Sequence, residues 1–98
     1  MNNLNNFLQV LTELSIPQSE LENFLEQNPQ VIDGDYDMFV ININTLYKER
    51  IPKDEIGNLL MQNANVLFYD NIDLKNKIKD LKQEGNLLEL IQQNPDIF

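Results

Sequence analysis

The stretch IPQSELENFLEQNPQVI at residues 16–32 returns 35 positions later as IPKDEIGNLLMQNANVL at residues 51–67. Both copies share the opening Ile-Pro, a Glu, a central apolar group, Gln-Asn and a closing apolar pair. Self-similarity at a fixed period is typical of proteins built from stacked structural repeats. The duplication therefore indicates two copies of one supersecondary unit.

A third copy, LLELIQQNPDIF, occupies residues 87–98. Each copy follows a segment whose apolar residues have the i, i+3, i+4, i+7 spacing of an amphipathic helix. These apolar residues are Leu4, Phe7, Leu8, Leu11 and Leu14, then Phe39, Ile43, Leu46 and Tyr47, then Leu74, Ile78 and Leu81. The sequence predicts an all-α fold, a short right-handed helical-repeat array of helix–helix–3₁₀ units with six main helices. We expect one domain over residues 1–98, with units near residues 3–33, 36–68 and 71–98.

Prolines and asparagines mark the predicted helix boundaries. Pro17 and Pro52 are expected in the first turn of the second helix of a unit, where a missing N–H costs nothing. A residue before proline avoids the helical region, so the Asn-Pro pairs at residues 28–29 and 94–95 should end a helix. The apolar pair that follows each stop is expected to turn back into the core as a short 3₁₀ turn.

One segment favours a different structure. Residues 40–44, Val-Ile-Asn-Ile-Asn, alternate between apolar and polar side chains, which is typical of a β-strand. The flanking residues align with helical segments of the other two copies. We therefore predict a helix here, and we expect Met38, Val40 and Ile41 to lie on a central helix that is covered on more than one side.

The repeats resemble those of the mitochondrial transcription termination factor family, mTERF. The resemblance rests on QNPQVI at 27–32, QNANVL at 62–67 and QNPDIF at 93–98, and it extends over nearly the whole chain. It implies units of two helices and a 3₁₀ element. Family members usually have many more units and bind duplex DNA or RNA through basic residues on an inner face. This chain departs from that pattern because it is short and acidic, its first unit lacks Lys and Arg, and Ala64 replaces the proline of the second copy.

Composition excludes several classes of function. The chain has no Cys and no His, which excludes disulfides, Cys or His metal sites, and Ser–His or Cys–His nucleophiles. We expect no catalytic residues, no metal and no cofactor, so the chain is not predicted to be an enzyme. It has no apolar run of roughly 18 residues that would span a membrane. No signal or transit peptide is recognised at the start, which favours a cytoplasmic location.

The charge of −9 is unevenly distributed: residues 1–47 carry seven acids and no base, and all seven bases lie within residues 48–82. The bases form one candidate set of nucleic-acid contacts: Lys48, Arg50, Lys53, Lys75, Lys77, Lys79 and Lys82. Lys75, Lys79 and Lys82 are spaced to project together from one helix. The alternative interpretation is a solvated helix face, with Asp80 and nearby acids in weak ion pairs.

The seven acids of residues 1–47 form a candidate surface for a partner: Glu13, Glu20, Glu22, Glu26, Asp33, Asp35 and Asp37. The segment 33–37, Asp-Gly-Asp-Tyr-Asp, begins like a calcium loop, but Met38 and Asn44 stand where that loop needs Gly and Glu. We therefore interpret it as a connection between repeats, with Asp37 near the start of the next helix.

Three functions fit these features. A non-enzymatic helical-repeat module that binds a protein, with a basic surface on the partner, is the favoured prediction. An mTERF-like nucleic-acid-binding factor is the first alternative, although the net charge disfavours it. A small acidic inhibitor that mimics nucleic acid is the second alternative.

Overall fold

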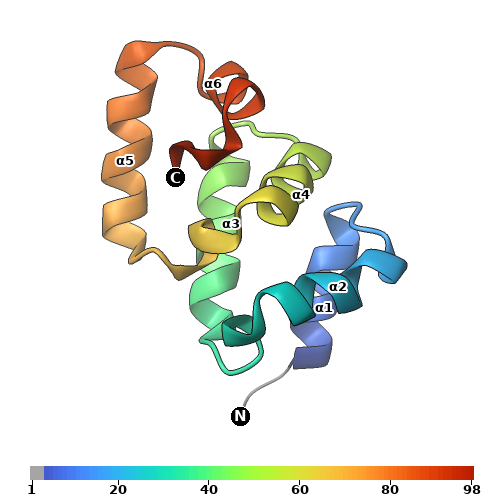
Figure 1. Cartoon of the computed structure of the whole chain (residues 1–98). Helices are drawn as coiled ribbons and strands as arrows, with labels where there is room; N and C mark the ends of the chain where they lie inside the picture. Colours follow the sequence, from blue (N-terminus) through green and yellow to red (C-terminus); the bar gives the residue numbers. More distant parts are fainter. Residues whose placement is uncertain (1–3) are drawn as a thin grey trace.

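The computed structural model describes residues 4–98, in which α-helices alternate with short 3₁₀ helices (Figure 1). The order is α1 (Leu4–Glu13), α2 (Gln18–Gln27), η1 (Pro29–Val31), α3 (Tyr36–Lys48), α4 (Lys53–Gln62), η2 (Ala64–Phe68), α5 (Asn71–Glu84), α6 (Leu87–Gln93) and η3 (Pro95–Ile97). A helix, a second helix and a 3₁₀ helix thus follow one another three times. The all-α helical-repeat prediction with six main helices is confirmed.

Residues 40–44 lie inside α3, and no residue from 4 to 98 is in a β-strand. The choice of a helix over a strand is therefore confirmed. α3 is central, because it contacts α1 on one side and α5 on the other. Figure 1 shows the same order, with α1 and α2 on one side of α3 and α5 on the opposite side.

The turn inside the first unit has the same geometry as the turn inside the second. Ser15 and Arg50 stand 35 positions apart, and both have a left-handed φ of 66°. The next residue, Ile16 or Ile51, then donates its N–H to a carbonyl five positions earlier. The prolines that follow are N-caps of α2 and α4, one position before the first helical turn in which they were predicted.

Asparagine, rather than proline, is common to the three helix ends. Asn28, Asn63 and Asn94 are the C-caps of α2, α4 and α6. Each donates its backbone N–H to the carbonyl of the residue four positions earlier. The Oδ1 atoms of Asn63 and Asn94 also accept the N–H of the residue two positions on, which begins the 3₁₀ helix. The second unit can therefore stop its helix with Ala64 in place of proline.

Aromatic rings fill the junction between the first two units. Phe7 of α1 lies 5.4 Å from both Tyr36 and Phe39 of α3, and Phe39 lies 5.2 Å from Phe68 at the end of η2. The Tyr36 hydroxyl donates a hydrogen bond to the Ile32 carbonyl, so its polar atom is satisfied at the edge of the core. Such ring pairs contribute about 0.5–1.5 kcal/mol each beyond area burial.

Several apolar residues are more exposed than their pattern predicted. Ile41 and Tyr47 of α3 are 51% and 53% exposed. Ile32 is 40% exposed, since only Val31 of that pair turns into the core. Ile97 of the last pair is half-buried. The prediction that α3 is covered on more than one side is confirmed by its contacts with α1 and α5, although Ile41 itself is exposed. The prediction that both members of each apolar pair turn into the core was wrong at Ile32.

A buried amide joins α3 to the second and third units. Asn42 is fully buried, and its Nδ2 lies within hydrogen-bond distance of the carbonyls of Val66, Leu67 and Tyr69, at 3.2, 3.2 and 2.9 Å. Its Oδ1 accepts a 2.9 Å hydrogen bond from Asn71 at the start of α5. The network fixes where α5 begins relative to α3, which positions the groove described below.

Candidate nucleic-acid interface

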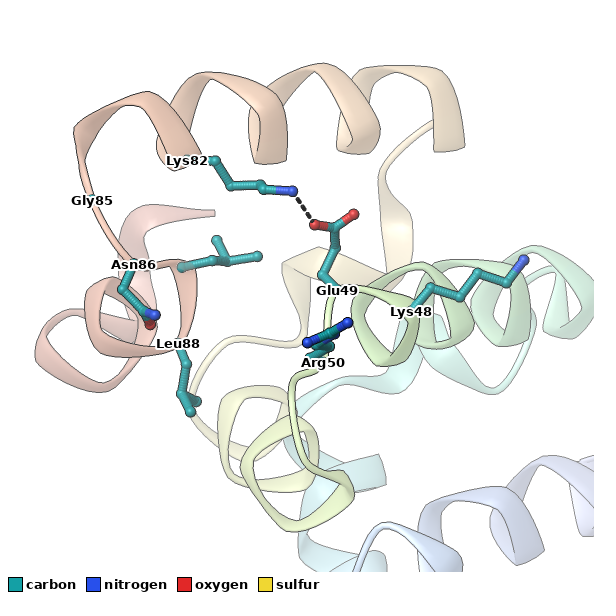
Figure 2. A pocket seen from close by; sticks show the side chains of 8 residues that line it. Lys48, Glu49, Arg50, Lys82, Gly85, Asn86 and Leu88 are labelled. Atoms are coloured by element: carbon teal, nitrogen blue, oxygen red, sulfur yellow. Dashed lines mark hydrogen bonds and ion pairs between the residues drawn. The ribbon is translucent and has the colours of Figure 1, made fainter.

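A hollow of about 490 Å³ lies between the end of α3, the end of α5 and the start of α6 (Figure 2). Its lining comes from the α3–α4 junction at residues 48–50, from the α5–α6 junction at residues 85–88, and from Lys82 on α5. The lining residues are Lys48, Glu49, Arg50, Lys82, Gly85, Asn86, Leu87 and Leu88. The hollow therefore combines residues of the second and third units, and neither unit forms it alone.

A second hollow, of about 320 Å³, continues along α3 toward the start of α5. It shares Lys48 and Glu49 with the first, and its lining is completed by Ile41, Asn44, Thr45, Asn71 and Lys75. We call the two together the α3–α5 groove. Four of the seven basic residues line it, and they come from α3, from the α3–α4 turn and from two turns of α5.

Glu49 is the acid of this lining, and it is ion-paired. Its Oε1 lies 2.7 Å from the Nζ of Lys82, 33 positions later in the chain. The two side chains are 29% and 54% exposed, and Figure 2 shows them reaching toward each other across the hollow. This is the one ion pair within residues 4–98.

The Lys48 side chain extends away from Asn86 and Leu88 in Figure 2, along α3. It belongs to the lining of both hollows, so it connects them. Arg50 reaches the groove because the chain leaves α3 through a left-handed residue at that position.

Hydrogen bonds between side chains hold the two walls together beneath the groove. The Asn71 Nδ2 lies 2.9 Å from the Oδ1 of Asn42 and 2.9 Å from the Oγ1 of Thr45. Thr45 in turn donates to the Ile41 carbonyl. α3 and the first turn of α5 are therefore tied together before any ligand is present, and the basic side chains above them start from a fixed scaffold.

The family model for mTERF matches residues 1–98. This chain belongs to the mTERF family. No match is found among curated proteins or among solved structures. The family match and the observed helix–helix–3₁₀ order agree, and the mTERF resemblance of the three Gln-Asn segments is confirmed.

The structure separates the seven basic residues of this mTERF chain into groups. Lys48, Arg50, Lys75 and Lys82 line the groove. The Lys53 Nζ lies 5.7 Å from the ring centroid of Tyr47, on the neighbouring face of α3.

The other two lysines are on α5. Lys79 is exposed one turn after Lys75, on the same side of the helix, but lines neither hollow. Lys77 is half-buried, and it points to the opposite side because two positions on a helix are about 200° apart. On α5, therefore, the side that carries Lys75 and Lys82 lines the groove, and the side that carries Lys77 does not.

The seven acidic candidates of the mTERF chain are all exposed. Asp35 is the N-cap of α3 and accepts the N–H of Met38 at 3.2 Å. Asp37 and Glu20 lie in the first turns of α3 and α2, where a negative charge stabilises the helix. Glu22 and Glu26 are one turn apart on α2. The expectation that Asp37 lies near a helix start is confirmed, and the cap itself is Asp35.

Sequence patterns missed several groove residues. Glu49, Asn71 and Asn86 carry no motif, and nothing in the spacing of Glu49 and Lys82 indicates that they pair. The 35-residue period was the one signal that could have indicated a contact between these segments. It places the ends of α3 and α5 at equivalent positions of neighbouring repeats.

Two further observations concern residues 4–98. No three His, Cys, Asp or Glu side chains in this range are placed to bind a metal ion together. None of the helices described is both long enough and apolar enough to cross a membrane.

Proposed function

We propose that this mTERF chain binds nucleic acid through the α3–α5 groove, where basic side chains contact backbone phosphates. The family consists of non-enzymatic nucleic-acid-binding factors. The single observation that carries the proposal is the convergence of Lys48, Arg50, Lys75 and Lys82 on one groove from two separate segments, residues 48–50 and α5.

The net charge of −9 does not prevent this binding at physiological salt. Residues 1–47 carry seven acidic residues and no basic one. Most of these acids belong to the α1–α2 unit, which lies on the other side of α3 from α5 (Figure 1). The molecule measures 37 × 25 × 20 Å, and exposed charges are screened over about 8–10 Å at 0.1–0.15 M salt. The acids of the first unit therefore contribute only weak long-range repulsion, and in the groove lining four basic side chains outnumber one acid, Glu49.

The binding is expected to be weak and to depend on salt rather than on sequence. Each phosphate neutralised on duplex DNA contributes about −0.9 to the slope of log K against log salt. Four basic residues in the groove thus set an upper limit of roughly −3.6 for this slope. Phosphate contacts position a protein without specifying bases, so a low sequence preference follows.

Two lysines of one helix provide the test. Lys75 lines the groove and Lys77 lies on the opposite side of α5, so Lys75→Gln and Lys77→Gln remove the same charge from different faces. Fluorescence anisotropy with labelled duplex DNA, single-stranded DNA and RNA at low salt measures the affinity. We expect Lys75→Gln to weaken binding severalfold and Lys77→Gln to leave it nearly unchanged. No binding to any of the three probes at micromolar protein would refute the proposal.

Protein binding is the second candidate, and two exposed apolar side chains favour it. Ile41 is 51% exposed in the groove, and Ile72 is 69% exposed directly after the groove residue Asn71. Single exposed apolar residues are common on protein surfaces, but two beside one hollow suit a docking contact. The exposed acids of the first unit would favour a partner with a basic surface. Loss of a cross-linked partner in the Ile41→Ser, Ile72→Ser double variant, and not in Ile32→Ser, would support this function.

A further inference from the structure

We infer that Glu49 sets how strongly the α3–α5 groove holds phosphate, because it occupies the Lys82 ammonium and places a negative charge among the basic side chains. This inference rests on the proposed nucleic-acid binding. Glu49 is the one acidic residue that lines the groove, and it lines both hollows.

The position of Glu49 has little structural justification. It is the C-cap of α3, where the helix dipole favours a positive and not a negative side chain. Its ion pair with Lys82 is exposed to solvent at 29% and 54% of the two side chains, and ion pairs of this kind contribute little to stability. Helix stability and fold stability therefore do not explain an acid at this place.

The ion pair does change what the groove offers to a ligand. Of the four basic residues in the lining, Lys82 has its ammonium 2.7 Å from the Glu49 carboxylate. A phosphate that approaches Lys82 must replace this carboxylate and lies beside its charge. Lys48, Arg50 and Lys75 remain as cations without such a partner in the groove. Removing the Glu49 charge would release Lys82 as a further phosphate contact.

The experiment measures oligonucleotide affinity as a function of salt for the wild type, Glu49→Gln and Glu49→Ala. For Glu49→Gln we expect severalfold tighter binding at low salt. The slope of log K against log salt should become steeper by about 0.9 on duplex DNA or about 0.7 on a single strand. This corresponds to an additional loss of affinity of about threefold between 50 and 200 mM salt. The Gln side chain of the first variant can still hydrogen-bond to Lys82. Glu49→Ala removes that contact as well, and it should change the affinity and the slope in the same direction.

Two controls separate this effect from a general change of charge. Glu26→Gln removes the same charge from an exposed position of α2, on the far side of α3, and should leave the slope unchanged. Lys82→Gln should flatten the slope less in the wild-type background, where Glu49 already occupies the ammonium, than in the Glu49→Gln background. It should reduce the slope by about 0.9 in the Glu49→Gln background. Far-UV circular dichroism checks that each variant is folded.

Every outcome decides between the two proposals. If the wild type binds and the Glu49 variants show the same slope and affinity, the role of Glu49 is refuted and nucleic-acid binding stands. If neither the wild type nor the Glu49 variants bind, both are refuted. Binding that appears only after Glu49 is replaced supports the role of Glu49 and refutes nucleic-acid binding by the wild-type chain.

Discussion

The side-chain amide of Asn71 donates a 2.9 Å hydrogen bond to the Oδ1 of Asn42, which stands 29 positions earlier and is fully buried. Asn42 uses its own Nδ2 to approach three carbonyls at the end of η2 and beyond it. A single buried amide thus connects α3, the η2 segment and α5. The network is one of several polar links between the second and third units, and it lies directly below the groove.

Replacing Asn42 should destabilise the fold. Asn42→Ala leaves buried carbonyls and the Asn71 amide without their partner, at about 1–3 kcal/mol for such groups, and adds a cavity. We expect a loss of roughly 2–4 kcal/mol in the free energy of unfolding, measured by urea denaturation. Asn44→Ala changes the same residue type at an exposed position two residues away and should cost less than about 0.5 kcal/mol. Equal losses in the two variants would contradict the assigned role.

Gly57 should not tolerate a methyl group. A Cβ at this position would lie 2.3 Å from the Leu14 carbonyl oxygen, so α4 passes against the backbone that ends the first helix of the first unit. Overpacking of this kind costs about 1–3 kcal/mol, and we expect Gly57→Ala to lower the thermal midpoint accordingly. Gly85→Ala is the matched control, since a Cβ there meets nothing within 4 Å. A drop in midpoint no larger than that of the control would show that the helices can move apart freely.

Replacing Ser15 or Arg50 by glycine should stabilise the folded protein. Each has a φ of 66°, a left-handed conformation that costs other residues about 1–2 kcal/mol. Ser15→Gly and Arg50→Gly are therefore expected to raise the free energy of unfolding by up to about 1 kcal/mol. Arg50→Gly also removes a guanidinium from the groove, so it should weaken oligonucleotide binding while the protein becomes more stable. Ser15→Gly should leave binding unchanged, and weaker binding there would point to an indirect effect of the turn.

Ala64→Pro should be accepted at the end of α4. Asn63 has φ −150° and ψ 87°, and Asn94 has φ −150° and ψ 91° directly before Pro95. The backbone before residue 64 thus already has a conformation that permits proline. We expect a gain of about 0.4–1 kcal/mol in the free energy of unfolding, because proline restricts the unfolded chain. A clear loss in denaturant unfolding would mean that the buried Ala64 site has no space for the ring.

The sequence alone determined the order of the elements and the places where the helices end. These features depend on spacing along one segment: apolar stripes at helical intervals, and an Asn that recurs at the end of each second helix. Such signals are local, and a 35-residue period repeats them, so two related segments support each prediction. The helix in residues 40–44 was predicted in this way against a strand-like alternation.

The tertiary structure decided which side chains meet. Four of the seven basic residues line the groove, Lys77 faces elsewhere, and Glu49 pairs with Lys82 across 33 positions. Likewise, Ile41 and Tyr47 are exposed although their apolar character suggested burial. These outcomes depend on how far α5 is rotated and shifted relative to α3, which packing between units sets through contacts such as Asn42 with Asn71. No pattern within one helix carries that information, because a helix face becomes a wall of a groove only when another helix packs beside it.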